Sequence, residues 1–172
     1  MTKFLTKSVL AATVALLATP ALAAPAGTST FDSKAKIVKP VTMTKVTDLD
    51  FGTTTMNPAL VSATVTVGDA DGSVAVCSSA QLTCSGGFPA SFTLSSGVQG
   101  QTVQISFDNP PAKLDHTSLA GKSVPFSLDA VEDVLLDSAG AGEFNIGGKI
   151  TVVSATADGE YKATVNIVAN YL

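Results

Sequence analysis

The sequence predicts an all-β protein, a single sandwich of about seven to nine short antiparallel strands. Three observations predict this fold class. Short runs rich in Val, Thr and Ile recur along the chain and are separated by Gly, Pro, Asn and Asp. No segment keeps a convincing helical period over about eleven residues. The segment 159–171 alternates apolar and polar residues with a period of two, as a half-buried strand does.

The first residues have the features of a secretory signal peptide. Lys3 and Lys7 precede the uncharged apolar run 9–18, and Ala21-Leu22-Ala23 is a small-residue cleavage site. The apolar run is shorter than the roughly 20 residues of a membrane span, so an uncleaved anchor is the less favoured alternative. We therefore expect residues 1–23 to be removed and the mature protein to be exported. Residues 24–33 then form a short N-terminal arm, and residues 34–172 form one sandwich domain.

The amino-acid composition disfavours the classes of binding function that need a basic surface. The formal net charge is −4, and the chain contains neither arginine nor tryptophan. An acidic, arginine-free protein is a poor candidate for binding nucleic acid or an anionic membrane surface. We expect no nucleic-acid partner, and no membrane association after signal cleavage.

The first half of the domain contains four predicted strand segments. Residues 35–46 are strand-like, although Pro40 restricts them to an edge or a bent strand. A short second piece follows at 49–52. Residues 62–67 lead through the turn GDADG into 73–77.

The second half continues the pattern. Residues 81–84 are expected to pair with 73–77 in a hairpin, and 90–96 to pair with 101–107 around GVQG. After a polar loop, further strands are predicted at 124–132 and 144–155. Within 127–140 a helix is the alternative to a strand followed by a loop, and its β-branched residues favour the strand.

The last strand has one largely apolar face and one polar face. Glu160, Lys162 and Thr164 belong to the polar face. The apolar face is expected to consist of Tyr161, Ala163, Val165, Ile167, Ala169 and Tyr171. Such a face has to be covered by other residues, because it would otherwise promote aggregation.

The only cysteines are Cys77 and Cys84. In an exported chain an even count predicts a disulfide, and two cysteines allow one connectivity. We expect this bond to close a local hairpin. A zinc site is disfavoured because no His lies near the two thiols.

The sequence contains no convincing catalytic constellation. His116, the only histidine, lies in the polar segment KLDHTSLAG and is interpreted as a solvated loop residue. The segment GDADGS resembles the start of a calcium loop, but its twelfth position from Asp69 is Ala80, so the closing carboxylate is missing. Asp129, Glu132, Asp133 and Asp137 are read as a solvated face rather than a cation site. We expect a protein that is not an enzyme and binds no cofactor or metal.

Two stretches carry a family resemblance: DLDFG (48–52) and GEYKATVNIVANY (159–171). Together they resemble the secreted Ig-like subunits of archaic chaperone–usher pili and the related spore coat protein U family. A closer resemblance is to a family of bacterial exported proteins of undefined function. Those proteins share the opening seen here as Ile37-Val38-Lys39-Pro40 and Leu49-Asp50-Phe51-Gly52. Coat-protein-U subunits usually link the first strand to a later one by a disulfide, whereas both cysteines here are close in sequence.

The resemblance implies a pilin-type Ig-like sandwich that lacks one strand. Its final strand would border the resulting groove, first facing a periplasmic chaperone and then the arm of the next identical subunit. The implied function is a structural subunit of a surface fibre assembled by donor-strand exchange. Its location would be the periplasm in transit, then the cell surface or the extracellular space. The candidate donor residues alternate along the arm: Phe31, Ser33, Ala35 and Ile37.

A self-contained domain is the alternative. Residues 34–46 would then pair within the same chain and nothing would be donated. Such a monomer would be a secreted binding or adhesion module that presents the loops 85–89 and 108–123 to a ligand.

Overall fold

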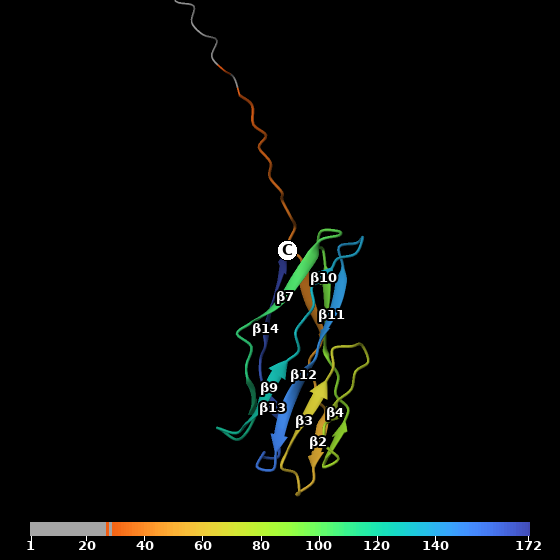
Figure 1. Cartoon of the computed structure of the whole chain (residues 1–172), viewed down its shortest axis with the longest axis vertical. Coiled ribbons are helices and arrows are strands. Elements are labelled where there is room, and N and C mark those ends of the chain that lie inside the picture. The colour runs from red at the N-terminus through yellow and green to blue at the C-terminus, as the bar shows by residue number, and fades with distance from the viewer. Residues whose placement is uncertain (1–26, 28) are drawn as a thin grey trace, which may run out of the picture. The chain divides into compact units, whose positions relative to one another are not determined.

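The computed structural model describes residue 27 and residues 29–172 and consists of strands and loops (Figure 1). Residues 37–172 contact one another and form one compact body, and the residues up to Lys36 form a separate unit. The predicted signal peptide, 1–23, and residues 24–26 and 28 of the predicted arm lie outside the described residues. Residues 29–41 carry no strand.

The body contains short strands that are all paired antiparallel. The first seven are β1 (Thr42–Thr47), β2 (Thr53–Met56), β3 (Ser62–Val67), β4 (Val76–Cys77), β5 (Leu82–Ser85), β6 (Ala90–Ser95) and β7 (Thr102–Asp108). The remainder are β8 (Lys113–His116), β9 (Ser123–Leu128), β10 (Val134–Leu135), β11 (Gly142–Ile146), β12 (Gly148–Val153), β13 (Tyr161–Lys162) and β14 (Asn166–Tyr171).

The strands form two layers of a β-sandwich (Figure 1). In the first layer, β1 pairs with β6 and β2 with β5, and the bridge between Asp50 and Phe88 joins the two ladders. β11 lies on the other side of β6. In the second layer, β7 pairs with β10 and β14, while β13, β8, β9, β12, β3 and β4 follow one another in a six-stranded sheet. The prediction of an all-β sandwich is therefore confirmed.

Two chain segments change partners along their length. β11 pairs with β6 in the first layer, and after Gly147 the same segment continues as β12 between β9 and β3. The final segment pairs with β8 through β13 and with β7 through β14. These interruptions divide long predicted strands into shorter ones and raise the number of strands above the expected seven to nine.

The apolar core has two parts, and every residue in both is hydrophobic. One part is centred on Leu94, Val103 and Leu136, between β6, β7 and the loop after β10. The other is centred on Val65, Leu82 and Val152. Each strand contributes alternate residues, as the buried positions 63, 65 and 67 of β3 illustrate.

Five local predictions about strands and their pairing are wrong. The strand piece expected at 49–52 forms only the isolated bridge at Asp50, and the strand β2 begins at Thr53 instead. The strand expected over 35–46 begins only at Thr42. The segments 90–96 and 101–107 do not form a hairpin, because β6 and β7 lie in different layers. The segments around Cys77 and Cys84 also lie in different sheets, β4 beside β3 and β5 beside β2. Finally, the predicted loop 108–123 contains the strand β8.

Candidate binding groove

The described structure has an open groove of about 1670 Å³. One wall is the segment from Met43 to Met56, which contains β1 and β2. The opposite wall is the segment from Thr156 to Ile167, which contains β13 and the start of β14. The groove therefore separates the first and the last strands of the body.

All four strands in these walls lie at the edge of their sheets. β1 ends the order β1-β6-β11, β14 ends β10-β7-β14, and β2 and β13 are likewise terminal in theirs. An edge strand has a row of backbone N–H and C=O groups without strand partners. A chain segment lying in the groove would meet apolar side chains below it and strand edges at its sides.

The floor of the groove is apolar and comes from both layers. Its largest members are aromatic: Phe92 of β6 stacks on Phe144 with ring centroids 5.1 Å apart, and Phe126 of β9 meets Phe51 edge-on at 6.0 Å. The other hydrophobic residues along the floor are Ala90, Phe107, Leu114, Val124, Leu128, Ile146, Ile150 and Val152. Close-packed aromatic rings of this kind give the floor a fixed shape.

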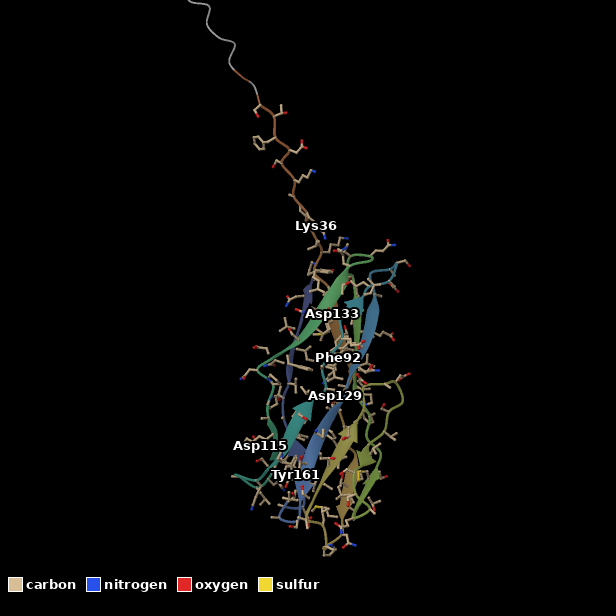
Figure 2. All side chains as sticks on the ribbon, viewed as in Figure 1. Lys36, Phe92, Asp115, Asp129, Asp133 and Tyr161 are labelled. Carbon is tan, nitrogen blue, oxygen red and sulfur yellow. A yellow bond between two sulfur atoms is a disulfide. The ribbon has the colours of Figure 1, made fainter. Side chains whose placement is uncertain are left out.

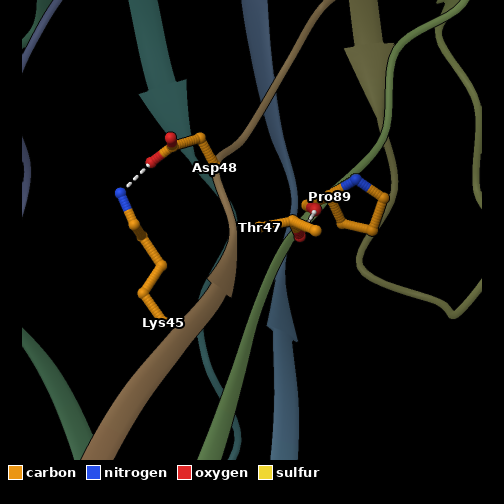
Figure 3. A network of polar contacts seen from close by, with 4 residues as sticks. All are labelled: Lys45, Thr47, Asp48 and Pro89. Atoms are coloured by element: carbon orange, nitrogen blue, oxygen red, sulfur yellow. Dashed lines mark hydrogen bonds and ion pairs between the residues drawn. The ribbon is translucent and has the colours of Figure 1, made fainter.

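The Thr47 side chain joins the first wall to the segment just before β6 in the same layer (Figure 3). The Thr47 hydroxyl donates a hydrogen bond of 3.1 Å to the carbonyl oxygen of Pro89. Lys45 forms an ion pair of 2.6 Å with Asp48 at the end of β1. Both ionic side chains are exposed, so this pair contributes little to stability.

The motif Leu49-Asp50-Phe51-Gly52 forms the middle of this wall. The Asp50 carboxylate accepts a 2.7 Å hydrogen bond from the Gly52 amide, while the Asp50 backbone pairs with Phe88. Gly52 has a φ of 67°, and a Cβ there would overlap the carbonyl oxygen of Ser85. The motif thus turns the chain from β1 to β2 and directs Phe51 onto Phe126.

The second wall contains the predicted final strand, which is interrupted between Lys162 and Asn166. Tyr161, Val165 and Ile167 are half-buried and line the groove. Ala163 also lines the groove but is exposed, because it lies in the interruption. Ala169 and Tyr171 are half-buried against the first core cluster, beyond the lining residues.

Both tyrosines of this segment are held by hydrogen bonds. The Tyr171 hydroxyl accepts a 3.0 Å bond from the Val98 amide in the turn before β7. The Tyr161 hydroxyl donates a 2.7 Å bond to the carbonyl oxygen of Ala157. The segment is therefore fixed near both of its ends, while its middle lies against the groove.

His116 is not a solvated loop residue, as the sequence suggested, but a half-buried residue at the end of β8. Its Nδ1 accepts hydrogen bonds of 3.0 Å from the amides of both Ser118 and Leu119. Its Nε2 lies 2.9 Å from the carbonyl oxygen of Asp158, and its ring packs edge-on against Tyr161. Figure 2 shows Tyr161 close to Asp115, the neighbour of His116. Sequence patterns did not indicate this cluster, since its members are far apart along the chain.

The candidate donor residues lie before β1. Phe31 is 89 % exposed and Ile37 is 94 % exposed, and Ser33 and Ala35 between them are also exposed. Residues 29–41 include no strand, so the unpaired segment is longer than the predicted arm of 24–33.

The predicted disulfide between Cys77 and Cys84 is present, with Cα atoms 5.8 Å apart. Its role differs from the expected hairpin closure. Cys77 lies in β4, which pairs with β3, and Cys84 lies in β5, which pairs with β2. The bond therefore connects the two layers, and both cysteines pack on the second core cluster.

Other polar features of the described residues belong to turns and surfaces. Asp137 accepts hydrogen bonds from the amides of Ala139 and Ala141 and so organises the turn after β10. Glu132 and Asp133 are exposed. Within residues 27 and 29–172, no three His, Cys, Asp or Glu side chains gather in a way that could hold a metal ion. In the same residues no helix has the length and hydropathy needed to cross a membrane.

The two loops expected to present a ligand site in the alternative function, 85–89 and 108–123, are both paired with strands of the sheets. The segment 85–89 contains Gly86, Gly87 and Phe88, and Phe88 is bridged to Asp50 and lines the groove. The segment 108–123 contributes β8 to the six-stranded sheet, which leaves only its ends as loops.

Comparison with known proteins identifies the family. No curated protein matches the chain, and no solved structure does. Residues 41–171 match the model of a domain of unknown function, DUF4402. The match begins just before β1 and ends with β14, so it spans both walls of the groove. The chain belongs to the DUF4402 family.

Proposed function

We propose that this protein is a non-catalytic structural subunit of a bacterial surface fibre, assembled by donor-strand exchange. One observation carries the proposal: an open groove with an apolar floor lies between two walls of edge strands, β1–β2 and β13–β14. The resemblance of the LDFG and C-terminal stretches to chaperone–usher pilins and coat protein U subunits supports the same function. The family itself is defined only as a domain of unknown function.

The groove favours a β-strand as its occupant. A strand exposes backbone hydrogen-bonding groups alternately on its two sides, so one inserted between β1 and β14 can pair with both. Its side chains also alternate, so every second one faces the apolar floor. Such strand addition gives affinity through backbone bonds and specificity through side-chain pockets.

The arm of a second copy fits these requirements. Phe31, Ala35 and Ile37 recur on one side of an extended chain, and Ser33 is the one small polar residue among them. Ten extended residues span about 33 Å, which is enough to reach a neighbouring subunit. The two large apolar side chains, Phe31 and Ile37, are exposed in the single chain and would be buried in a groove.

A groove of this kind needs temporary cover during export, because exposed apolar edges aggregate. We infer that a periplasmic chaperone supplies a strand in transit, and that the neighbouring subunit replaces it in the fibre. The mature protein is then exported, first to the periplasm and finally to the cell surface or the extracellular space.

The test is electrophoresis of the exported protein with and without heating. Strand-exchanged polymers should resist unheated SDS as a ladder and collapse to one band on boiling. Removal of residues 24–39 should abolish the ladder. A matched pair of point variants refines the test: Ile37→Asp should abolish the ladder, whereas Val38→Asp, on the other side of the extended arm, should preserve it.

The contrary result would support the self-contained binding module. A single monomer band in unheated SDS, with the same thermal stability after removal of residues 24–39, would contradict the fibre proposal. It would mean that the arm neither fills a neighbour's groove nor pairs with its own body.

A further inference from the structure

We infer that the segment Lys39-Pro40-Val41 prevents the arm from filling the groove of its own chain, and so reserves the arm for the groove of a second copy. The groove is the binding site of the arm only under the proposed function, on which this inference rests. The proposed function leaves open why the arm acts between chains rather than within one, and the segment 39–41 supplies the reason.

The arm joins the body at one end of the groove. Thr42, the first residue of β1, pairs with Ser95, the last residue of β6. Tyr171, the last residue of β14, is hydrogen-bonded to the amide of Val98, just beyond the end of β6. β1 therefore starts at the end of the body where β14 finishes, and the two strands run in opposite directions. An arm that entered its own groove beside β1 would have to reverse its direction before or near Thr42 and lie antiparallel to β1.

A tethered arm that could make this reversal would fill its own groove in preference to a neighbour's. A short flexible tether holds its ligand at an effective concentration of about 1 mM. At a protein concentration of about 1 μM, the tethered arm would have an advantage of about a thousandfold over the arm of another molecule. This advantage is lost only where the tether cannot follow the required path.

The apolar side of the arm limits which reversals are useful. Directly opposite residues of an antiparallel pair point to the same side of the sheet. The β1 residues that line the groove are Met43, Lys45 and Thr47, so the odd-numbered, apolar side of the arm has to lie opposite them. Only a loop with an odd number of residues achieves this. A two-residue loop would instead turn Lys34 and Lys36 toward the groove floor.

The shortest suitable loop has three residues, and the sequence opposes each of its possible positions. Three-residue hairpin loops typically place their third residue in the left-handed region, at positive φ. Loops at 38–40, 39–41 and 40–42 would place Pro40, Val41 and Thr42 there. Proline fixes φ at about −65°, and β-branched residues are rarely found at positive φ. In the loop 39–41, Pro40 also disfavours the helical conformation that Lys39 would need.

Longer reversals lack suitable residues as well. Between Ser33 and Thr47 the chain contains no glycine, asparagine or aspartate, the residues that adopt positive φ most readily. Val41 is half-buried against the first core cluster, so the chain leaves the body from a fixed point. An arm from a second copy can enter the groove without any such turn. A hinge that cannot fold back therefore favours exchange between copies over closure within one copy.

Glycine at the third loop position tests this block in the full exported chain. In Pro40→Asp with Val41→Gly, the loop 39–41 gains residues that its conformation favours. The SDS-resistant ladder should weaken, and a monomer should appear whose arm and β1 are protected from amide hydrogen exchange. The matched control is Pro40→Asp with Val41→Ala, which loses the same valine contact but keeps a Cβ at the left-handed position. The ratio of protected monomer to ladder should be at least about fivefold higher in the glycine variant than in this control.

A second variant leaves Pro40 and Val41 unchanged. Insertion of Gly-Ser-Gly-Ser between Val38 and Lys39 supplies a flexible reversal, and it should also move subunits from the ladder to the protected monomer. Exchange protection of the core strand β3 shows that each variant is folded. If neither folded variant forms the protected monomer, the segment 39–41 is not what keeps the arm out of its own groove. A wild-type monomer whose arm is already protected would overturn the block as well.

The outcomes separate the block from the proposed function. If the wild type forms no ladder, the fibre proposal fails. The block then still stands if the arm is unprotected in the wild-type monomer and protected in the glycine variant. If the ladder forms to the same extent in the wild type and in both variants, the fibre proposal stands and the block fails.

Discussion

At the scale of single residues, the LDFG motif has these residues because the chain turns there and passes close to the segment after Ser85. Asp50 accepts from the Gly52 amide and pairs through its backbone with Phe88, while Phe51 packs on Phe126. Gly52 combines a left-handed backbone with close approach to the segment after Ser85. Only glycine meets both conditions without strain.

Gly52→Ala should destabilise the protein more than Gly72→Ala. Both glycines have positive φ, at 67° and 75°, so both substitutions incur the left-handed cost of about 1 kcal/mol. A Cβ at position 72 meets nothing within 4 Å, whereas one at position 52 overlaps the Ser85 carbonyl oxygen and the Gly87 amide. The free energy of unfolding, from urea denaturation, should therefore fall further for Gly52→Ala. Equal losses of unfolding free energy in the two variants would contradict the close approach of Gly52 to the segment after Ser85.

At the scale of elements, the sequence predicted the strand-rich architecture better than the strand partners. Period-two alternation identified the final segment, and its half-buried positions agree with the predicted apolar face except at Ala163. Strand pairing depends on contacts between residues distant in sequence. For this reason β6 and β7 were expected to form a hairpin, although they lie in different layers.

The groove was predictable only in part. The last strand and the arm were visible as alternating patterns. The floor residues Phe92, Phe126 and Ile150 come from three strands of both layers, and no local pattern relates them. His116 was misread for the same reason, because its partner Asp158 lies 42 residues away.

The disulfide makes a prediction at this scale, since it joins β4 of one layer to β5 of the other. Replacing both Cys77 and Cys84 by Ser should lower the free energy of unfolding by about 2–3 kcal/mol. Urea denaturation should show this as a lower midpoint. Reduction of the wild type with dithiothreitol is the matched control and should lower the midpoint by a similar amount. An unchanged denaturation midpoint in both samples would show that the disulfide between the layers does not contribute to stability.

At the scale of the whole molecule, the body has a buried core and one open side. The core clusters around Leu94 and Val65 are fully apolar, so the sandwich does not depend on the groove being filled to exclude water from its centre. The groove, in contrast, leaves Met43, Phe51 and Ile167 only half-buried. A strand from outside would bury them, which is the physical basis of the proposed assembly.

Hydrogen exchange read by mass spectrometry, on assembled and heat-dissociated protein, tests the central claim most directly. The account predicts that three segments gain protection together on assembly: the arm (29–39), β1 and β14. The edge strand β4, which contributes no residue to the lining of the groove, should show no change and serves as the internal control. If the arm exchanges equally fast in both samples, or if β1 and β14 gain no protection, the groove does not receive a donated strand.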